Sequence, residues 1–310
     1  MSLDTSTLVI IGGVGVLSIV LWIFLKAKNQ SNDNSEQSKR KNVIISLKNP
    51  DIKYQFALAY KENISHDTRR FRFQLPSVKH VLGLPIGQHI YLTAHINGEL
   101  VKRPYTPTTS DDNQGYFDLV IKVYPNGKMT QYLDKLPLGH TIDVSGPSGN
   151  LVYKDNGLFD IRARKPDPFV TRRVRHLGLI AGGTGITPMY QILNEILKEQ
   201  ISIVPGQNPE IKIWLLFANQ TEDDILLREE LEHLAASNSD RFKLWYTVDR
   251  ESENWKYSKG FIDEKLIKEH MPPPSDDVLI CICGPPPMIK YACLPNLEKL
   301  GYAENMRYTF

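Results

Sequence analysis

The sequence predicts a chain of three parts: an N-terminal transmembrane helix, an antiparallel β-barrel, and an α/β domain built on a parallel sheet. Three observations lead to this prediction. An uncharged apolar run opens the chain, short strand-like segments separated by turn signals follow it, and strand-like runs then alternate with helix-like ones. The 310 residues are enough for two domains of ordinary size behind an anchor.

The composition is that of a globular protein, with 41% hydrophobic and 23% charged residues. The formal net charge of +2 is too small for nucleic-acid binding to be the main function. The three cysteines (Cys281, Cys283 and Cys293) do not form a disulfide framework, which favours a reducing compartment. Cys281 and Cys283 lack further Cys or His partners at ligand spacing, so we expect no metal site.

The apolar run from Thr7 to Leu25 holds 19 residues without a charge. As a helix it would be about 28 Å long, close to the thickness of one bilayer core. Lys26 and Lys28 follow it, so the positive-inside bias places the rest of the chain in the cytosol. The alternative, a cleaved secretory signal, fits poorly because no positively charged segment precedes the run. We assign residues 1–28 to a membrane anchor and 29–43 to a flexible tether. The endoplasmic reticulum and the outer mitochondrial membrane both stay open as the host membrane.

Residues 44–156 are strand-like and are punctuated by turn signals such as Asn97-Gly98 and Asn126-Gly127. Short strands at this spacing predict a small antiparallel barrel or sandwich, with one helix at Met129 to Leu136. Residues 157–175 are rich in charge and proline, so we expect them to form the connection between the domains.

From residue 176 to 310, four predicted strands alternate with four predicted helices, which favours a parallel sheet with right-handed crossovers. The predicted strands are 177–181, 211–218, 242–248 and 278–283, and the predicted helices are 190–199, 223–236, 261–270 and 287–300. The chain ends in Phe310, for which a mobile tail is the ordinary expectation.

The segment Arg103-Pro104-Tyr105-Thr106-Pro107 combines a donor fork suited to phosphate, an aromatic plane and a hydroxyl. Pro104 lacks an N–H and indicates a kinked strand or a sheet edge. A ligand with a flat ring system at one end and a pyrophosphate at the other, such as FAD, would use all three groups. A surface arginine beside a core tyrosine explains the same residues about equally well.

Two glycine turns follow predicted strands, namely Ala181 to Pro188 and Cys283 to Met288. Ligands of parallel sheets bind at the carboxyl ends of strands, where glycines let a backbone approach a pyrophosphate. Asp249 closes the third strand and would accept from a ribose hydroxyl, which favours NADH over NADPH. Structural turns without a ligand remain the alternative for these motifs.

Taken together, five motifs in order resemble the NADH–cytochrome b5 reductases, within the ferredoxin–NADP⁺ reductase superfamily, from about Pro50 to the C-terminus. The motifs are Arg-Pro-Tyr-Thr-Pro (103–107), Ile-Lys-Val-Tyr (121–124), Gly-Lys-Met-Thr (127–130), Gly-Gly-Thr-Gly-Ile-Thr-Pro (182–188) and Cys-Gly-Pro-Pro-Pro-Met (283–288). The resemblance implies a six-stranded FAD-binding barrel followed by an NADH-binding α/β domain. Only Pro125-Asn126 join the second and third motifs, and this short loop leaves the adenine contacts of FAD open.

The resemblance also implies the roles of individual residues. Thr106, Thr187 and Cys283 would lie beside the reacting flavin and nicotinamide rings. FAD would be bound by Arg103, Pro104, Tyr105, Thr106, Val120, Lys122, Lys128, Met129, Thr130 and Thr187. NADH would be bound by Gly182, Gly183, Gly185, Asp249, Cys283, Gly284, Pro285 and Met288.

The implied reaction is hydride transfer from NADH to N5 of FAD, followed by single-electron transfer to cytochrome b5. Lys53, Lys128 and Lys165 are candidates for docking this acidic haem protein. Two alternatives are a membrane-bound NADH diaphorase for a quinone or another redox protein, and a flavin-free membrane-tethered scaffold of the same fold.

Overall fold

The fold is taken from a computed structural model that describes residues 43–198 and 210–310. Residues 45–310 form one compact unit. The predicted transmembrane helix, Thr7 to Leu25, and the predicted tether as far as residue 42 lie outside the described residues. Within the described ranges, no helix is both long and apolar enough to cross a membrane.

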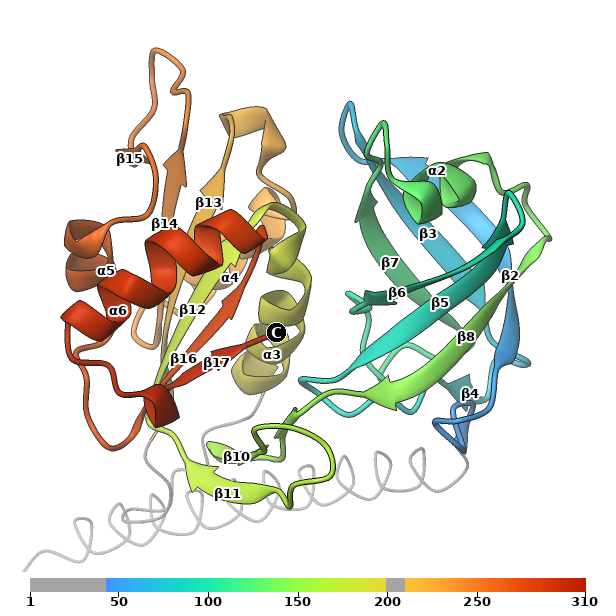
Figure 1. Cartoon of the computed structure of the whole chain (residues 1–310), viewed down its shortest axis with the longest axis horizontal. Helices are drawn as coiled ribbons and strands as arrows, with labels where there is room; N and C mark the ends of the chain where they lie inside the picture. The colour runs from blue at the N-terminus through green and yellow to red at the C-terminus, as the bar shows by residue number, and fades with distance from the viewer. Residues whose placement is uncertain (1–42, 199–209) are drawn as a thin grey trace, which may run out of the picture. The chain divides into compact units, whose positions relative to one another are not determined.

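The first part is a curled antiparallel sheet of six strands in the order β6-β5-β8-β2-β3-β7 (Figure 1). These strands are β2 (Tyr54–Asn63), β3 (Thr68–Gln74), β5 (His89–Ile96), β6 (Glu99–Tyr105), β7 (Tyr116–Lys122) and β8 (Thr141–Ser148). β6 and β7 are the two edges of the sheet and do not pair with each other. The predicted barrel is therefore a curled sheet that hydrogen bonds do not close. Two short strands, β1 (Ile44–Ile45) and β4 (His80–Val81), stand outside this sheet.

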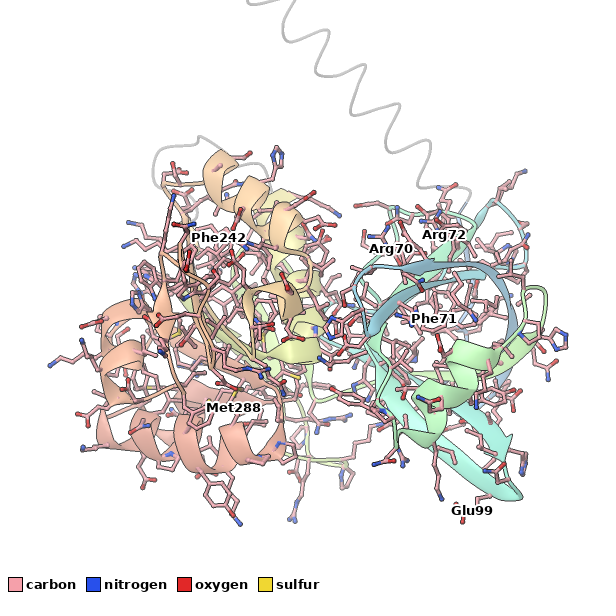
Figure 2. The ribbon with its side chains drawn as sticks, turned by 90° about the horizontal axis from the view of Figure 1, so that it is seen from above. Arg70, Phe71, Arg72, Glu99, Phe242 and Met288 are labelled. Carbon is pink, nitrogen blue, oxygen red and sulfur yellow. The ribbon has the colours of Figure 1, made fainter. Side chains whose placement is uncertain are left out.

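Alternating aromatic side chains fill the inside of the curl. Phe71 and Phe73 of β3 are fully buried, and Figure 2 shows Phe71 inside the curl between Arg70 and Arg72. The rings of Phe73 and Phe117 stack with their centroids 5.4 Å apart. Each buried aromatic contributes about 1.5–3 kcal/mol by leaving water, so this face fixes the register of the strands. Helix α2 (Lys128–Lys135) begins one residue before the predicted helix and buries Met129 and Leu133 in the same core.

The segment predicted as a connection without pattern contains two strands, which corrects that prediction. β10 (Leu158–Ile161) pairs with β9 (Leu151–Tyr153) and with β11 (Val170–Arg173) in a three-stranded antiparallel sheet. Asn156 and Gly157 both have positive φ, which allows the tight turn between β9 and β10. Phe159 is fully buried and lies 4.9 Å from the ring of Tyr153. A four-residue strand is too short for its alternation to stand out among charged residues and prolines.

The second part is a six-stranded parallel sheet in the order β15-β14-β13-β12-β16-β17. Its strands are β12 (His176–Gly182), β13 (Lys212–Asn219), β14 (Phe242–Val248), β15 (Ser258–Lys259), β16 (Val278–Cys283) and β17 (Arg307–Thr309). The predicted parallel sheet is confirmed, and β14 and β16 have the predicted bounds. The C-terminal segment is not a mobile tail, because β17 adds to the sheet beside β16 and Phe310 donates its N–H to Ile282 O at 3.0 Å.

The helices of this part differ from the predicted ones mainly at their ends. They are α3 (Ile186–Lys198), α4 (Arg228–Ser237), α5 (Glu264–His270) and α6 (Leu294–Lys299), with short turns η1 (Gly183–Gly185), η2 (Glu222–Asp224), η3 (Met288–Cys293) and η4 (Glu304–Met306). α5 begins at Glu264 rather than at Phe261, because the Asp263 carboxylate caps it by accepting from Leu266 N at 2.8 Å. The predicted helix 223–236 is interrupted at Leu227, whose φ is +56°.

Candidate functional site

The residues predicted to bind a flavin lie on the two edges of the curled sheet. Arg103, Pro104 and Tyr105 belong to edge strand β6, which confirms the sheet-edge position that Pro104 indicates. The Arg103 guanidinium is exposed and donates to Lys102 O at 2.8 Å, so it is accessible to a phosphate. Tyr105 is half-buried, and burial raises its pKa to about 12. The phenol therefore stays neutral at pH 7 and keeps an aromatic face beside the half-buried Thr106.

The amino end of α2 supplies the anion-binding groups of this half. Gly127 is the N-cap residue and has no side chain, so the first backbone N–H groups of α2 receive no capping hydrogen bond from it. The Lys128 ammonium pairs with the Glu99 carboxylate. Met129 and Thr130 are buried, and Thr130 Oγ1 accepts from Tyr124 N at 3.2 Å. At this end of α2, the backbone N–H groups of Lys128, Met129 and Thr130 are therefore suited to contact a phosphate.

Two further predicted flavin residues are buried rather than exposed to a ligand. Val120 is only 4% exposed and packs in the core cluster that continues into the parallel-sheet part. Thr187, in the first turn of α3, is 8% exposed and donates from Oγ1 to Thr184 O at 3.2 Å. Both would reach a ligand chiefly through their main chain.

The two glycine turns lie side by side at the carboxyl ends of β12 and β16, where Ala181 is the register partner of Cys283. A Cβ on Gly182 would lie 2.6 Å from Met288 Sδ, and one on Gly284 would lie 3.1 Å from Gly182 Cα. The glycines are thus required for the turns to approach each other. Residues of both turns line one cavity, whereas Cys283 itself does not. Gly183 has φ +52° and open space at its Cβ position.

A cavity of about 600 Å³ opens at this edge of the parallel sheet, within the usual range for a ligand site. Five of the residues predicted to bind NADH line it, namely Gly182, Gly183, Asp249, Pro285 and Met288. The other predicted NADH residues, Gly185, Cys283 and Gly284, are not part of the lining and lie in the turns behind it. The curled sheet contributes Thr68, Lys122 and Tyr124 to the same cavity.

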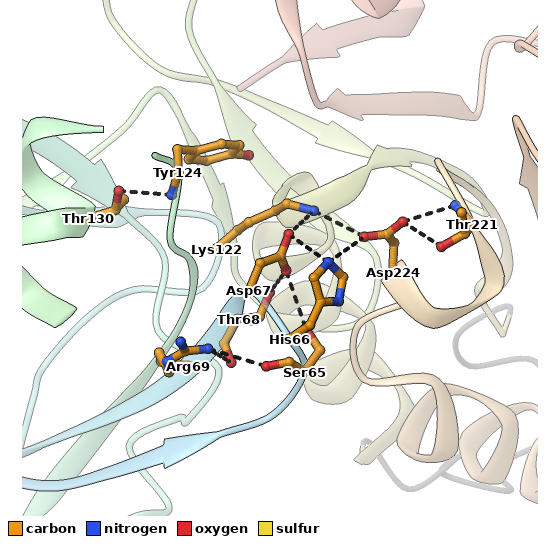
Figure 3. Close-up of polar contacts among 10 residues, drawn as sticks. All are labelled: Ser65, His66, Asp67, Thr68, Arg69, Lys122, Tyr124, Thr130, Thr221 and Asp224. Carbon is orange, nitrogen blue, oxygen red and sulfur yellow. Dashed lines mark hydrogen bonds and ion pairs between the residues drawn. The ribbon is translucent and has the colours of Figure 1, made fainter. Parts of the chain in front are cut away.

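Lys122 lies on the wall of this cavity, although the sequence assigned it to the flavin. Its Nζ lies 2.6 Å from Asp67 Oδ2 and 3.1 Å from Asp224 Oδ1 (Figure 3). Although burial disfavours the charge of all three groups, these contacts raise the pKa of Lys122 and lower the pKa values of both carboxyls. Burial raises the pKa of Asp249, which also lines the cavity.

Cys283 is a neutral thiol rather than a nucleophile. Burial raises its pKa to about 11, so its thiolate fraction at pH 7 is negligible. Such a group can pack beside a ring without reacting with it.

Several lining residues were not predicted from the sequence. Phe261 and Tyr291 are 79% and 70% exposed, as large aromatic side chains rarely are. Asp224 was placed inside a predicted helix, and Phe261 at the start of another. Ala218, Asn219 and Gln220 also line the cavity, and their place at the carboxyl end of a strand was the available signal.

The candidate docking lysines occupy different surroundings. Lys53 Nζ lies 3.5 Å from Asp143 Oδ2, and Lys128 is paired with Glu99. Lys165 is exposed between β10 and β11.

The residues present fit FAD. The exposed guanidinium of Arg103 and the uncapped amides of α2 suit its phosphates, and the half-buried Tyr105 suits its ring system. The cavity beside them suits a second nucleotide.

Comparisons with known proteins agree with this arrangement. The family description "Oxidoreductase FAD-binding domain" matches residues 55–153, and "Oxidoreductase NAD-binding domain" matches residues 179–294. NADH-cytochrome b5 reductase 3 of Rattus norvegicus is 54% identical over 281 residues, covering 88% of this chain and 91% of the relative. NADH-cytochrome b5 reductase 2 of Xenopus tropicalis is 48% identical over 318 residues, covering 100% of this chain and 99% of the relative. The solved cytochrome b5 reductase domain of Ulva prolifera nitrate reductase is 40% identical with a TM-score of 0.77, covering 85% of this chain and 99% of that one.

Proposed function

The chain belongs to the NADH–cytochrome b5 reductase family, and from that premise we propose how its residues divide the reaction between them. It is a flavoenzyme that oxidises NADH with FAD and passes the electrons to cytochrome b5. FAD, when bound, supplies the chemistry that converts a two-electron hydride transfer into single-electron steps. One observation carries the assignment of roles: the curled sheet and the two glycine turns line the same cavity.

On the flavin side, Arg103 and the first amides of α2 hold the phosphates, and Tyr105 supports the ring. This division follows from the exposed guanidinium, the uncapped helix end and the neutral phenol. Thr106 follows Tyr105 directly and offers a hydroxyl near the reacting edge.

On the nucleotide side, the backbone of Gly182 and Gly183 faces the pyrophosphate of NADH, and Asp249 accepts from the adenosine ribose. The apolar group around Phe261 and Met288 then suits the adenine. Thr187 and Cys283 lie behind the lining and would support the nicotinamide end from there, and the neutral Cys283 thiol would not act as a base. Hydride transfer requires proximity and orientation rather than a general base.

The primary test is a stopped-flow experiment on the full-length protein in detergent. Mixing with NADH should bleach the flavin absorbance, and a second mixing with oxidised cytochrome b5 should reduce the haem. Flavin bleaching without haem reduction would move the assignment to another acceptor, and a colourless protein would overturn the flavoenzyme assignment.

We place the docking surface for cytochrome b5 around Lys53, Lys128 and Lys165, since that partner is acidic around its haem edge. Replacing Lys53 and Lys165 by Glu should slow reduction of cytochrome b5 at low salt and leave reduction of ferricyanide unchanged. The matched control is Lys265→Glu on α5, which makes the same charge change on an exposed side chain of the other domain. Equal effects of all three substitutions would contradict the docking surface.

We place the membrane anchor at Thr7 to Leu25, on the strength of its length and lack of charge. The full-length chain should stay in the membrane pellet after alkaline carbonate extraction. A chain recovered in the supernatant would contradict the anchor and leave the redox assignment intact.

A further inference from the structure

A charged cluster joins the curled sheet to the parallel-sheet domain at the wall of the cavity (Figure 3). The ammonium of Lys122, at the end of β7, lies 2.6 Å from Asp67 Oδ2 of the curled-sheet domain and 3.1 Å from Asp224 Oδ1 of the parallel-sheet domain. His66 Nε2 lies 3.4 Å from the Asp67 carboxylate and 4.0 Å from that of Asp224. A single ammonium therefore bridges two carboxylates from different domains.

Asp224 is held in the orientation that this bridge needs. Its Oδ2 accepts from Thr221 N at 3.1 Å and from Thr221 Oγ1 at 2.7 Å, which forms a capping box on η2. The other oxygen, Oδ1, is left to face Lys122. The Asp224 side chain is only 10% exposed, so solvent screens the pair weakly.

The charges of this cluster do not suit an anionic ligand as they stand. Lys122 is the only cationic side chain among the described residues that line the cavity, whereas Asp224 and Asp249 are acidic. NADH carries two phosphate charges, and besides the backbone of Gly182 and Gly183 the described lining offers them Lys122 as its positive side chain. In the free protein the one ammonium available is already held by Asp67 and Asp224.

His66, Asp67 and Asp224 are also arranged like the ligands of a cation, because their ligand atoms lie within 4.8 Å of one another. The Lys122 ammonium already supplies the positive charge among them. The cluster is therefore better explained by its lysine than by a metal ion.

We propose that Asp224 is a positioning residue for NADH binding: it holds Lys122 beside the cavity in the free enzyme, and bound NADH draws that ammonium from Asp224 to its pyrophosphate. This inference rests on the proposed function, because it takes NADH as the ligand of the cavity. Asp224 itself does not touch the reacting atoms. It sets the cost of freeing Lys122, the one cationic side chain among the described residues of the lining.

The test compares Asp224→Asn with wild type in steady-state reduction of ferricyanide by NADH. The Asn side chain can still cap η2 through its amide oxygen, but it presents no charge to Lys122. The KM for NADH should fall two- to fivefold at low ionic strength, with a smaller change in kcat, and the difference should shrink at high salt. A merely structural role would lower kcat or thermal stability without lowering KM.

Asp223→Asn is the matched control, since Asp223 lies in the same turn, is exposed and undergoes the same charge change. It should leave KM unchanged, and an equal fall in KM would show a general charge effect and overturn the proposal. In a Lys122→Met background, Asp224→Asn should no longer lower KM. A fall of the same size there would mean that Asp224 acts by direct repulsion, which also overturns the proposal.

Asp67→Asn offers a second measurement if Asp224→Asn does not fold, because Asp67 is the nearer partner of Lys122 and should give a KM shift of the same sign. Wild-type flavin that NADH fails to reduce would refute the proposed function itself. Normal reduction of wild type with unchanged KM in both variants would refute only the role of Asp224.

Discussion

Replacing Gly185 by Ala tests whether the close approach of the two glycine turns builds the NADH site. The added Cβ would lie 2.2 Å from Cys283 O and 2.8 Å from Gly284 N, and both are main-chain atoms of the facing turn. Restoring an ordinary contact of 3.4 Å requires the turns to separate by about 1.2 Å. Backbone at the ends of two paired, buried strands cannot yield as a flexible side chain does.

The expected costs follow from this displacement. Overpacking of a close-packed site costs about 1–3 kcal/mol, which lowers the melting temperature by about 2–12 °C for a domain of this size class. A shift of about 1 Å in a positioning element can cost about 100-fold in catalysis. We therefore expect Gly185→Ala to raise the KM for NADH or lower kcat by at least tenfold, while flavin absorbance is retained, because the Arg103 side of the site is untouched.

The assay is NADH–ferricyanide kinetics with thermal unfolding, and Gly98→Ala is the control. Gly98 has φ +81° and open space around its Cβ position, so its substitution adds backbone strain without a clash. If Gly185→Ala keeps wild-type kinetics and is destabilised no more than Gly98→Ala, the packing of the two turns is not what forms the nucleotide site.

Three further outcomes are expected. Arg103→Ala should lose bound flavin on gel filtration, with absorbance per protein falling several-fold, whereas Lys102→Ala on the same strand should retain it. Cys283 should react with iodoacetamide at pH 8 much more slowly than a free thiol, because burial raises its pKa to about 11, and alkylation as fast as that of a small-molecule thiol would contradict its burial. Although burial acts in the opposite direction, Lys122 lowers the pKa values of Asp67 and Asp224. The two carboxylates therefore stabilise the fold at pH values above their unfolded pKa of about 3.9. This contribution is lost as the pH falls through their lower pKa values in the folded protein. In urea unfolding between pH 3 and 6, the free energy of unfolding should therefore fall less steeply with decreasing pH for Asp224→Asn than for wild type.

The parallel sheet was predictable because buried parallel strands are continuous apolar runs. β14 and β16 were predicted with the bounds that the structure has, since nearly all residues of β16 are buried. The two glycine turns followed from their place after such strands. In contrast, β10, β11 and β17 are three or four residues long, and pairing with a neighbour rather than an internal pattern makes them strands.

The cavity was predictable only in part, for a related reason. Turn residues such as Gly182 and Met288 carry a local signal, because each follows a strand. Phe261 has no such signal: its side chain is exposed, and its place in the lining depends on where α5 begins, which the Asp263 cap determines. The contact of Lys122 with Asp224 depends on the packing of two domains, which no local pattern encodes.

Lys122 ends a strand of the curled sheet, yet it lies on the wall of the cavity. Register pairs Thr68 of β3 with Lys122 of β7, and both residues line the cavity beside the glycine turns. The end of this strand pair therefore forms a wall of the nucleotide site, although it belongs to the part that matches the FAD-binding domain. The part that matches the NAD-binding domain lacks that wall and the only lysine of the lining. In the proposed function both domains therefore contribute to the NADH site, and the Lys122–Asp224 ion pair is one of the contacts that join them.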